Sequence, residues 1–332
     1  MSPATRTLTL TTALALAMVP SGAVAEMADE HVTRSLQVRQ VRNVPFESSS
    51  LNALGRVDVY APTTAGRWPV VVMFHGDPMA VSKEYLTSDA IRVASRGAVV
   101  FVPTWGRSGG DEYDTLMPGA QIAADGAQAM CAVSFAQERA PGYGGDDGPI
   151  VLFGHSAGAM IASVLAFARP PASDGCLANG LADRPRALVT WEGDWLMTSE
   201  FWDFVLPIDP QSVLEGILPW AHLAKAPDLP VFVLTSDEPG LGERRVGSGE
   251  APEDWLRLRD PDGRLLEALH TADVIDDEVV ELDEQQWVFA QALLRNGNPV
   301  AYRVMPGSSH EQRSAAGDKV FLDTIALATS MR

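Results

Sequence analysis

Residues 150–158 read Ile-Val-Leu-Phe-Gly-His-Ser-Ala-Gly, an apolar run that leads directly into a Gly-x-Ser-x-Gly motif. The five-residue motif alone is a weak signal, because glycine and serine are common. Here the preceding run predicts a buried strand and residues 157–168 predict a helix. A strand before the motif and a helix after it make the signal strong. The stretch therefore predicts a strand–turn–helix unit with Ser156 at the turn.

The spacing of the two glycines has a physical reason. A sharp strand-to-helix turn forces its central residue into a strained backbone conformation, and a side chain two positions away on either side would collide. Gly154 and Gly158 remove those collisions. The turn holds the Ser156 hydroxyl at the start of a helix, where the N–H groups and the helix dipole favour a developing oxyanion. A serine hydroxyl is a poor nucleophile, so it needs a base and a carboxylate to orient that base.

Around this unit, short apolar runs alternate with helix-like segments, which is typical of a mostly parallel sheet covered by helices. The half-polar run at 56–60 predicts an edge or half-covered strand, and continuously apolar runs predict fully buried strands. These buried strands are expected at 70–74, 98–102, 150–153, 187–191, 231–235 and 300–304. Helices are expected at 79–95, 119–139, 157–168, 284–296 and 313–330.

From the strand at 56–60 to the last helix, this order of elements resembles the α/β-hydrolase superfamily. Tyr143-Gly144-Gly145-Asp146 and the Ser156 motif resemble the carboxylesterase and lipase branches. The resemblance implies an α/β fold, with a mostly parallel central sheet and helices on both faces. It also implies a catalytic triad in the chain order Ser, then Asp or Glu, then His.

The resemblance places the catalytic histidine after the last strand, where the chain reads Met-Pro-Gly-Ser-Ser-His at 305–310. His310 is therefore the expected base. Its loop position and its place in the chain order favour it over the remaining histidines outside the oxyanion loop. Those four are His31, His155, His222 and His270.

For the acid of the triad, the resemblance indicates the strand at 231–235, which leads into Ser-Asp-Glu-Pro-Gly. Asp237 is the expected residue because it follows the strand most closely, and Glu238 is the first alternative. Some relatives place the acid one strand earlier. Glu192 and Asp194, which follow the strand at 187–191, therefore also remain candidates.

The oxyanion hole is expected to use two backbone N–H groups. One is that of Ala157, directly after the nucleophile, and the other comes from the loop His75-Gly76-Asp77-Pro78. This loop resembles the family's His-Gly-Gly pattern but has Asp77 in place of a second glycine. We assign the donor to Asp77, with Gly76 as the alternative, and expect His75 to brace the loop.

Two long insertions interrupt the strand order. Residues 194–225 contain three tryptophans and two phenylalanines, which predicts a small helical cap over the site. An ordinary helical excursion that packs on the core is the alternative. Residues 239–283 are rich in Asp, Glu and Arg and predict a solvated surface excursion.

The N-terminal segment has the pattern of an export signal. Arg6 precedes an apolar run of about a dozen residues, which Ala23-Val24-Ala25 ends with small residues. Such a run is shorter than the roughly 20 residues needed to cross a bilayer, so a retained membrane anchor is not expected. We predict a signal peptide at 1–25, a mature hydrolase domain at 26–332 and a secreted protein, either extracellular or periplasmic.

Composition restricts the possible partners. A net charge of −18 repels phosphate backbones and anionic membrane surfaces, so nucleic-acid binding is not expected. The two cysteines, Cys131 and Cys176, are expected to form a disulfide in an oxidising compartment, with two buried thiols as the alternative. Cys and His show no metal-ligand spacing, so no metal site is expected. The expected acyl-transfer mechanism requires no metal or organic cofactor.

The expected function is hydrolysis of a small-molecule or polymeric carboxylic ester through an acyl-enzyme on Ser156. The alternatives are a peptidase, amidase or acyltransferase with the same triad, because all of these share the acyl-enzyme, and a non-catalytic binding protein of the same fold. Acyl and alcohol specificity and the oligomeric state are left open, because loop shape determines specificity.

Overall fold

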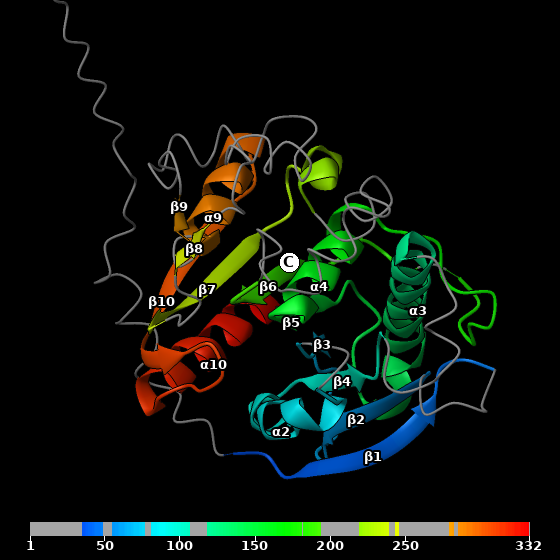
Figure 1. Cartoon of the computed structure of the whole chain (residues 1–332). Helices are drawn as coiled ribbons and strands as arrows, with labels where there is room; N and C mark the ends of the chain where they lie inside the picture. Colours follow the sequence, from blue (N-terminus) through cyan, green and yellow to red (C-terminus); the bar gives the residue numbers. More distant parts are fainter. Residues whose placement is uncertain are drawn as a thin grey trace, which may run out of the picture. The chain divides into compact units, whose positions relative to one another are not determined.

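A computed structural model of the chain describes residues 35–48, 55–76, 81–106, 118–180, 182–193, 219–238, 243–245, 279–281 and 285–331. Eight strands form one sheet in the order β1-β2-β4-β3-β5-β6-β7-β10 (Figure 1). The strands are β1 (Val38–Pro45), β2 (Arg56–Pro62), β3 (Val70–Phe74), β4 (Val99–Pro103), β5 (Val151–His155), β6 (Ala187–Trp191), β7 (Val231–Glu238) and β10 (Val300–Ser309). A separate two-stranded ribbon pairs β8 (Glu243–Arg245) with β9 (Val279–Glu281).

Most of the large sheet is parallel. From β4 through β10 every neighbouring pair is parallel, while β1 and β2 run antiparallel at one edge. The central strands β3, β4, β5 and β6 are buried along their whole length. Parallel strands covered on both faces are expected to be continuously apolar, as these are. The mostly parallel sheet predicted from the sequence is thus confirmed.

In the described part of the chain, five α-helices cover the two faces of the sheet. They are α2 (Thr87–Ser95), α3 (Pro118–Arg139), α4 (Ala157–Phe167), α9 (Gln285–Asn296) and α10 (Ala315–Ser330). Short 3-10 turns lie at η1 (Lys83–Leu86), η3 (Ala140–Tyr143) and η4 (Pro219–Lys225). Figure 1 shows α2 and α10 on one side of the sheet and α3, α4 and α9 on the other. Helices on both faces of the sheet match the predicted fold class.

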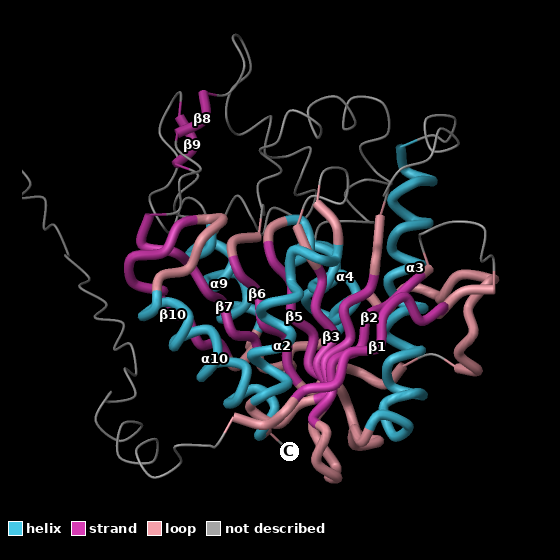
Figure 2. Tube along the Cα trace, turned by 90° about the horizontal axis from the view of Figure 1, so that it is seen from below, coloured by secondary structure: helices cyan, strands magenta, loops and turns pink. Residues whose placement is uncertain are grey.

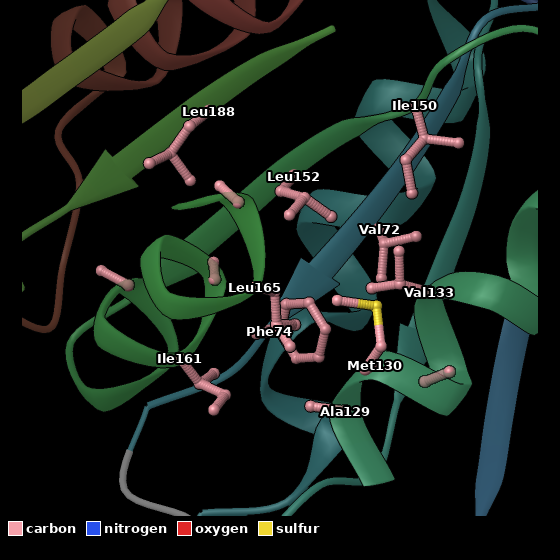
Figure 3. Packing of buried hydrophobic residues seen from close by; sticks show 14 of the residues in the cluster. Val72, Phe74, Ala129, Met130, Val133, Ile150, Leu152, Ile161, Leu165 and Leu188 are labelled. Carbon is pink, nitrogen blue, oxygen red and sulfur yellow. The ribbon is translucent and has the colours of Figure 1, made fainter. Parts of the chain in front are cut away.

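Each face of the sheet has its own apolar core. Alternate residues of the strands pack either against α3, α4 and α9 or against α2 and α10. Figure 3 shows part of the first core, where Val72 and Leu152 of the sheet face Met130 and Val133 of α3. Three polar residues, Ser156, Glu192 and His310, directly follow the last residues of β5, β6 and β10.

The path of the chain reverses direction between β3 and β5. From β3 the chain moves outward to β4 (Figure 1), and from β5 it moves the opposite way to β6 and β7 (Figure 2). In open α/β sheets, ligands bind outside the carboxyl ends of the strands at such a switch point. The loop after β3 and the Ser156 turn after β5 therefore flank the expected binding position.

A disulfide joins Cys131 of α3 to Cys176 in the segment after α4, with their Cα atoms 5.5 Å apart. The predicted bridge is therefore present. It fastens a segment that also pairs with the chain before β2. There, the backbone N–H of Leu177 donates to the carbonyl of Phe46 at 2.9 Å.

The described structure departs from the sequence expectations at several places. Strand β1 was not predicted, because it is an exposed edge strand with little apolar alternation. The helix expected at 79–95 is a 3-10 turn followed by α2, with 77–80 outside the described residues. The predicted signal peptide at 1–25 and most of the insertion at 239–283 also lie outside them. Of the cap expected at 194–225, only η4 is described, so the cap stays a prediction.

Candidate active site

Ser156 lies at the turn between β5 and α4 with φ 54° and ψ −126°, a conformation rarely adopted by a residue other than glycine. The neighbouring glycines make this turn possible. A Cβ on Gly154 would lie 2.1 Å from the carbonyl oxygen of Gly158, and a Cβ on Gly158 would lie 2.3 Å from that of Phe74. Both distances are far below van der Waals contact. The strained turn expected around Ser156 is thus present, and backbone of this kind is common at active sites.

The loop after β3 lies directly against Ser156, the expected nucleophile. A Cβ on Gly76 would come within 2.8 Å of the Cβ of Ser156, so only glycine fits there without a shift. His75 is fully buried, and its carbonyl accepts a hydrogen bond from Nε1 of Trp105 at 3.0 Å. Its Nδ1 lies 2.8 Å from the carbonyl oxygen of Gly76. These contacts agree with the bracing role expected for His75.

The two expected oxyanion donors differ in what the structure describes. Ala157 is the first residue of α4, and the first N–H groups of a helix have no partner within the helix. Its N–H therefore lies at the positive end of the helix dipole, next to Ser156. Asp77 lies outside the described residues, so its assignment as the second donor stays a prediction.

His310 directly follows the last residue of β10. The imidazole ring of His310 lies 4.9 Å, centroid to centroid, from that of His155, the residue before Ser156. The His310 side chain is 23% exposed, and its Nδ1 lies 3.7 Å from Oε2 of Glu192. Strand β10 thus brings the expected base to the end of β5 where the expected nucleophile lies.

Glu192 follows β6 directly and is fully buried, with φ 50°. Its Oε1 accepts hydrogen bonds from the backbone N–H of Ser236 at 2.5 Å and from the Thr235 hydroxyl at 3.1 Å. Among the described residues, neither Oε2 of Glu192 nor Nδ1 of His310 has a hydrogen-bond partner. A buried carboxylate held on one oxygen therefore presents the other to an imidazole nitrogen.

Asp237, the acid expected from the sequence, faces a different group. It lies within β7, which runs to Glu238, three residues beyond the predicted strand end. Its two carboxylate oxygens accept hydrogen bonds from the backbone N–H groups of Gly307 and Ser308, at 2.7 and 3.0 Å. These bonds lower the pKa of the Asp237 carboxyl, the one from Gly307 most of all. In the described structure His310 is therefore paired with Glu192, and Asp237 with the backbone of the His310 loop.

The other two alternatives for the acid are not described. Asp194 lies outside the described residues, and nothing is described of the Glu238 side chain. Glu192 was a minor candidate in the sequence, because an acid after β6 is the less usual order. Its signal there was its position immediately after a continuously apolar strand.

The site contains a second histidine. His155 is 4% exposed and lies between Tyr85 and Trp191, with ring centroids 5.6 and 4.0 Å away. Its Nε2 donates a hydrogen bond to the backbone carbonyl of His310 at 2.7 Å. Burial lowers the pKa of His155 well below its ordinary range, and the neighbouring His310 adds to that effect. His155 is therefore neutral near pH 7.

Neither a metal-binding cluster nor a membrane-spanning helix is found in the described part of the chain. No group of three or more His, Cys, Asp or Glu side chains there has the arrangement that holds a metal ion. Within the same residues, no helix is long and apolar enough to cross a membrane.

The sequence also matches the model of a protein family. Residues 28–192, from the N-terminal region through β6 and Glu192, match the model of the Carboxylesterase family. The chain is a carboxylic-ester hydrolase with an α/β-hydrolase fold. No curated protein shows significant similarity to this hydrolase.

Solved structures of other esterases share the fold of the hydrolase. An inhibited esterase B from Lactobacillus rhamnosis has a TM-score of 0.60 at 13% identity, covering 93% of this chain and 91% of its own. A truncated carbohydrate esterase from gut microbiota has a TM-score of 0.54 at 15% identity, covering 89% and 98%. A propionate-bound thermophilic esterase from the planctomycete Thermogutta terrifontis has a TM-score of 0.52 at 15% identity, covering 89% and 92%.

Proposed function

We propose that the hydrolase cleaves carboxylic esters through an acyl-enzyme on Ser156, with His310 as the base and Glu192 as the acid. The observation that carries this assignment is the pairing of His310 Nδ1 with Glu192 Oε2, 3.7 Å apart at the end of β6. The family match on 28–192 supports the reaction class. The strained turn at Ser156 supports its role as nucleophile.

In the proposed first step, Nε2 of His310 takes the hydroxyl proton of Ser156 as the serine oxygen attacks the ester carbonyl. Glu192 holds the imidazole in one tautomer through Nδ1–H and stabilises the imidazolium that forms. The carbonyl oxygen gains negative charge, which the N–H of Ala157 and one from the loop at 76–77 stabilise. The imidazolium then protonates the leaving alcohol, and the acyl group stays on Ser156.

In the second half, water attacks the acyl-enzyme while His310 takes its proton. The tetrahedral intermediate collapses, the carboxylic acid leaves, and the Ser156 hydroxyl regains its proton from the imidazolium. The same residues thus serve both steps. Each step requires only proton transfer and oxyanion stabilisation.

The choice of Glu192 over Asp237 follows from where each carboxylate lies. A triad acid is buried and lies beside the imidazole nitrogen that it orients. Glu192 is fully buried beside the ring, whereas Asp237 accepts two backbone N–H bonds from the loop that carries His310. We assign Asp237 a structural role in that loop.

Hydrolysis of p-nitrophenyl acetate and butyrate tests this function. Ser156→Ala is expected to lower kcat by roughly 10⁴-fold or more while leaving the fold intact. Parallel assays with matched amides should show much slower turnover. Ester turnover by Ser156→Ala near the wild-type rate would overturn the proposal, and amide turnover equal to ester turnover would reassign the enzyme as an amidase.

We also propose that the hydrolase acts outside the cytoplasm. The Cys131–Cys176 disulfide is of the kind that persists in oxidising compartments, and 1–25 has the pattern of an export signal. Protein recovered from the periplasm or the medium should begin near Glu26. Recovery only from the cytoplasm, with 1–25 intact, would contradict this localisation.

A further inference from the structure

The loop that carries His310 is fixed through its backbone by side chains from separate elements. The hydroxyl of Ser236, on β7, donates to the carbonyl of Ser309 at 2.9 Å. His155, on β5, donates to the carbonyl of His310 at 2.7 Å, and Tyr85, on η1, donates to that of Glu311 at 3.1 Å. Three consecutive carbonyls of this loop therefore have side-chain partners.

Among these three contacts, the one from His155 has a special position. His155 directly precedes Ser156, so a single side chain connects the nucleophile turn to the backbone of the residue that carries the base. Its bond is the shortest of the three and is largely shielded from water, because His155 is 4% exposed. A buried hydrogen bond of this kind holds geometry more firmly than one exposed to solvent.

The surroundings of His155 fix its orientation. The ring is stacked on Tyr85 at an interplanar angle of 16° and packs against Trp191 in a tilted arrangement at 30°. Trp191 is backed in turn by the guanidinium of Arg313, whose Cζ lies 4.4 Å from the Trp191 ring centroid. The stack leaves the imidazole of His155 little freedom to turn away from His310.

The neutral state of His155 also matters for the proposed reaction. His310 becomes an imidazolium during acyl transfer, and a second positive charge in a ring 4.9 Å away would oppose that change. With Nε2–H donated to a carbonyl, a neutral His155 leaves Nδ1 without a proton. Nδ1 has no hydrogen-bond partner among the described residues.

We propose that His155 is a positioning residue that sets the register of His310 against Ser156 through its Nε2–H bond to the His310 carbonyl. This inference rests on the proposed function of Ser156 and His310. His155 itself contacts the loop backbone and transfers no proton. Its role is to hold the base at the distance that proton transfer requires, where an error of about 1 Å costs on the order of 100-fold in rate.

A matched pair of substitutions tests this role. The side-chain amide nitrogen of Gln reaches about as far as Nε2 of His, whereas that of Asn stops near the position of Nδ1. His155→Gln is therefore expected to keep kcat within about fivefold of wild type, and His155→Asn to lower it by roughly 30- to 100-fold. KM should change less than threefold in both, because substrate contacts are retained.

A third variant and a control complete the test. His155→Leu removes the donor and should match His155→Asn. Asn298→Ala removes buried side-chain bonds to the carbonyls of Ala226 and Leu229, at the opposite end of β10 from His310. Asn298→Ala should lower the thermal midpoint and leave kcat unchanged. This control separates the general effect of losing a buried hydrogen bond from the specific effect of displacing His310 relative to Ser156.

Equal kcat for His155→Gln, His155→Asn and wild type would overturn the positioning role. A loss that appears in KM rather than kcat would also overturn it. Ser156→Ala and His310→Ala are assayed in parallel. If either of these two retains activity, the proposed function itself fails, which is a different outcome from the failure of the His155 inference alone.

Discussion

His310 Nδ1 and Glu192 Oε2 lie 3.7 Å apart, and the carboxylate of this pair is fully buried. Oε1 of the same carboxylate is held by Ser236 and Thr235 of the neighbouring strand β7. The strand order therefore positions the proposed acid: β6 supplies it, β7 orients it and β10 brings the proposed base to it. Because β6, β7 and β10 are neighbours in the sheet, the distance between the Glu192 and His310 side chains is closely constrained.

Glu192→Gln removes the charge and keeps the shape of the side chain. Because Gln cannot stabilise the imidazolium in the same way, kcat for p-nitrophenyl butyrate is expected to fall by roughly 10²- to 10⁴-fold. Asp237→Asn is the matched control and should lower kcat less than about tenfold. The reverse ranking of these two variants would return the acid role to Asp237.

The crowded turn at Ser156 predicts a sharp difference between glycines. A methyl group on Gly154 would lie 2.1 Å from a backbone oxygen, so Gly154→Ala should destabilise the fold by about 3 kcal/mol or more and lower kcat as Ser156 shifts. Gly142→Ala is the control, because nothing lies within 4 Å of the added methyl. Urea unfolding of both variants measures the difference, and equal midpoints would contradict the packing described here.

The fold and the strained turn at Ser156 could be predicted from the sequence because their signals are local. Apolar runs predict buried strands, and Gly154 and Gly158 predict the strained turn that Ser156 adopts. Local sequence signals do not decide which of the candidate carboxylates faces the histidine. The identity of the acid depends on the direction of a side chain after β6 or β7, and only the packed sheet shows that Glu192 faces His310 while Asp237 faces Gly307.

Asp237 contributes to the acid stability of the His310 loop. Its pKa in the folded chain is lowered, chiefly by the hydrogen bond from the Gly307 N–H. Because the pKa of Asp237 is lower in the folded chain than the ordinary value of 3.8, its ionised carboxylate stabilises the fold at pH values above 3.8. This stabilisation is lost as the pH falls through the pKa of the folded chain. The free energy of unfolding of wild type should therefore decline below about pH 4 more steeply than that of Asp237→Asn. Identical pH profiles from urea titrations would contradict this contribution.

The Cys131–Cys176 disulfide closes a loop with a sequence separation of 45. The chain-entropy model gives about 4 kcal/mol of stabilisation for a loop of that length. The double variant Cys131→Ala, Cys176→Ala should show a corresponding loss in urea unfolding and no response to dithiothreitol. Wild type should lose a similar amount when dithiothreitol is added, and an unchanged midpoint would contradict a stabilising bridge.

Ser156 is proposed to form a covalent intermediate, and active-site labelling detects such a nucleophile directly. The intact hydrolase is treated with a fluorophosphonate, and the modified peptide is located by tandem mass spectrometry. We expect a single stoichiometric adduct on Ser156, absent from Ser156→Ala and formed much more slowly in Glu192→Gln. A folded, ester-hydrolysing sample that is labelled on another serine, or on none, would contradict it.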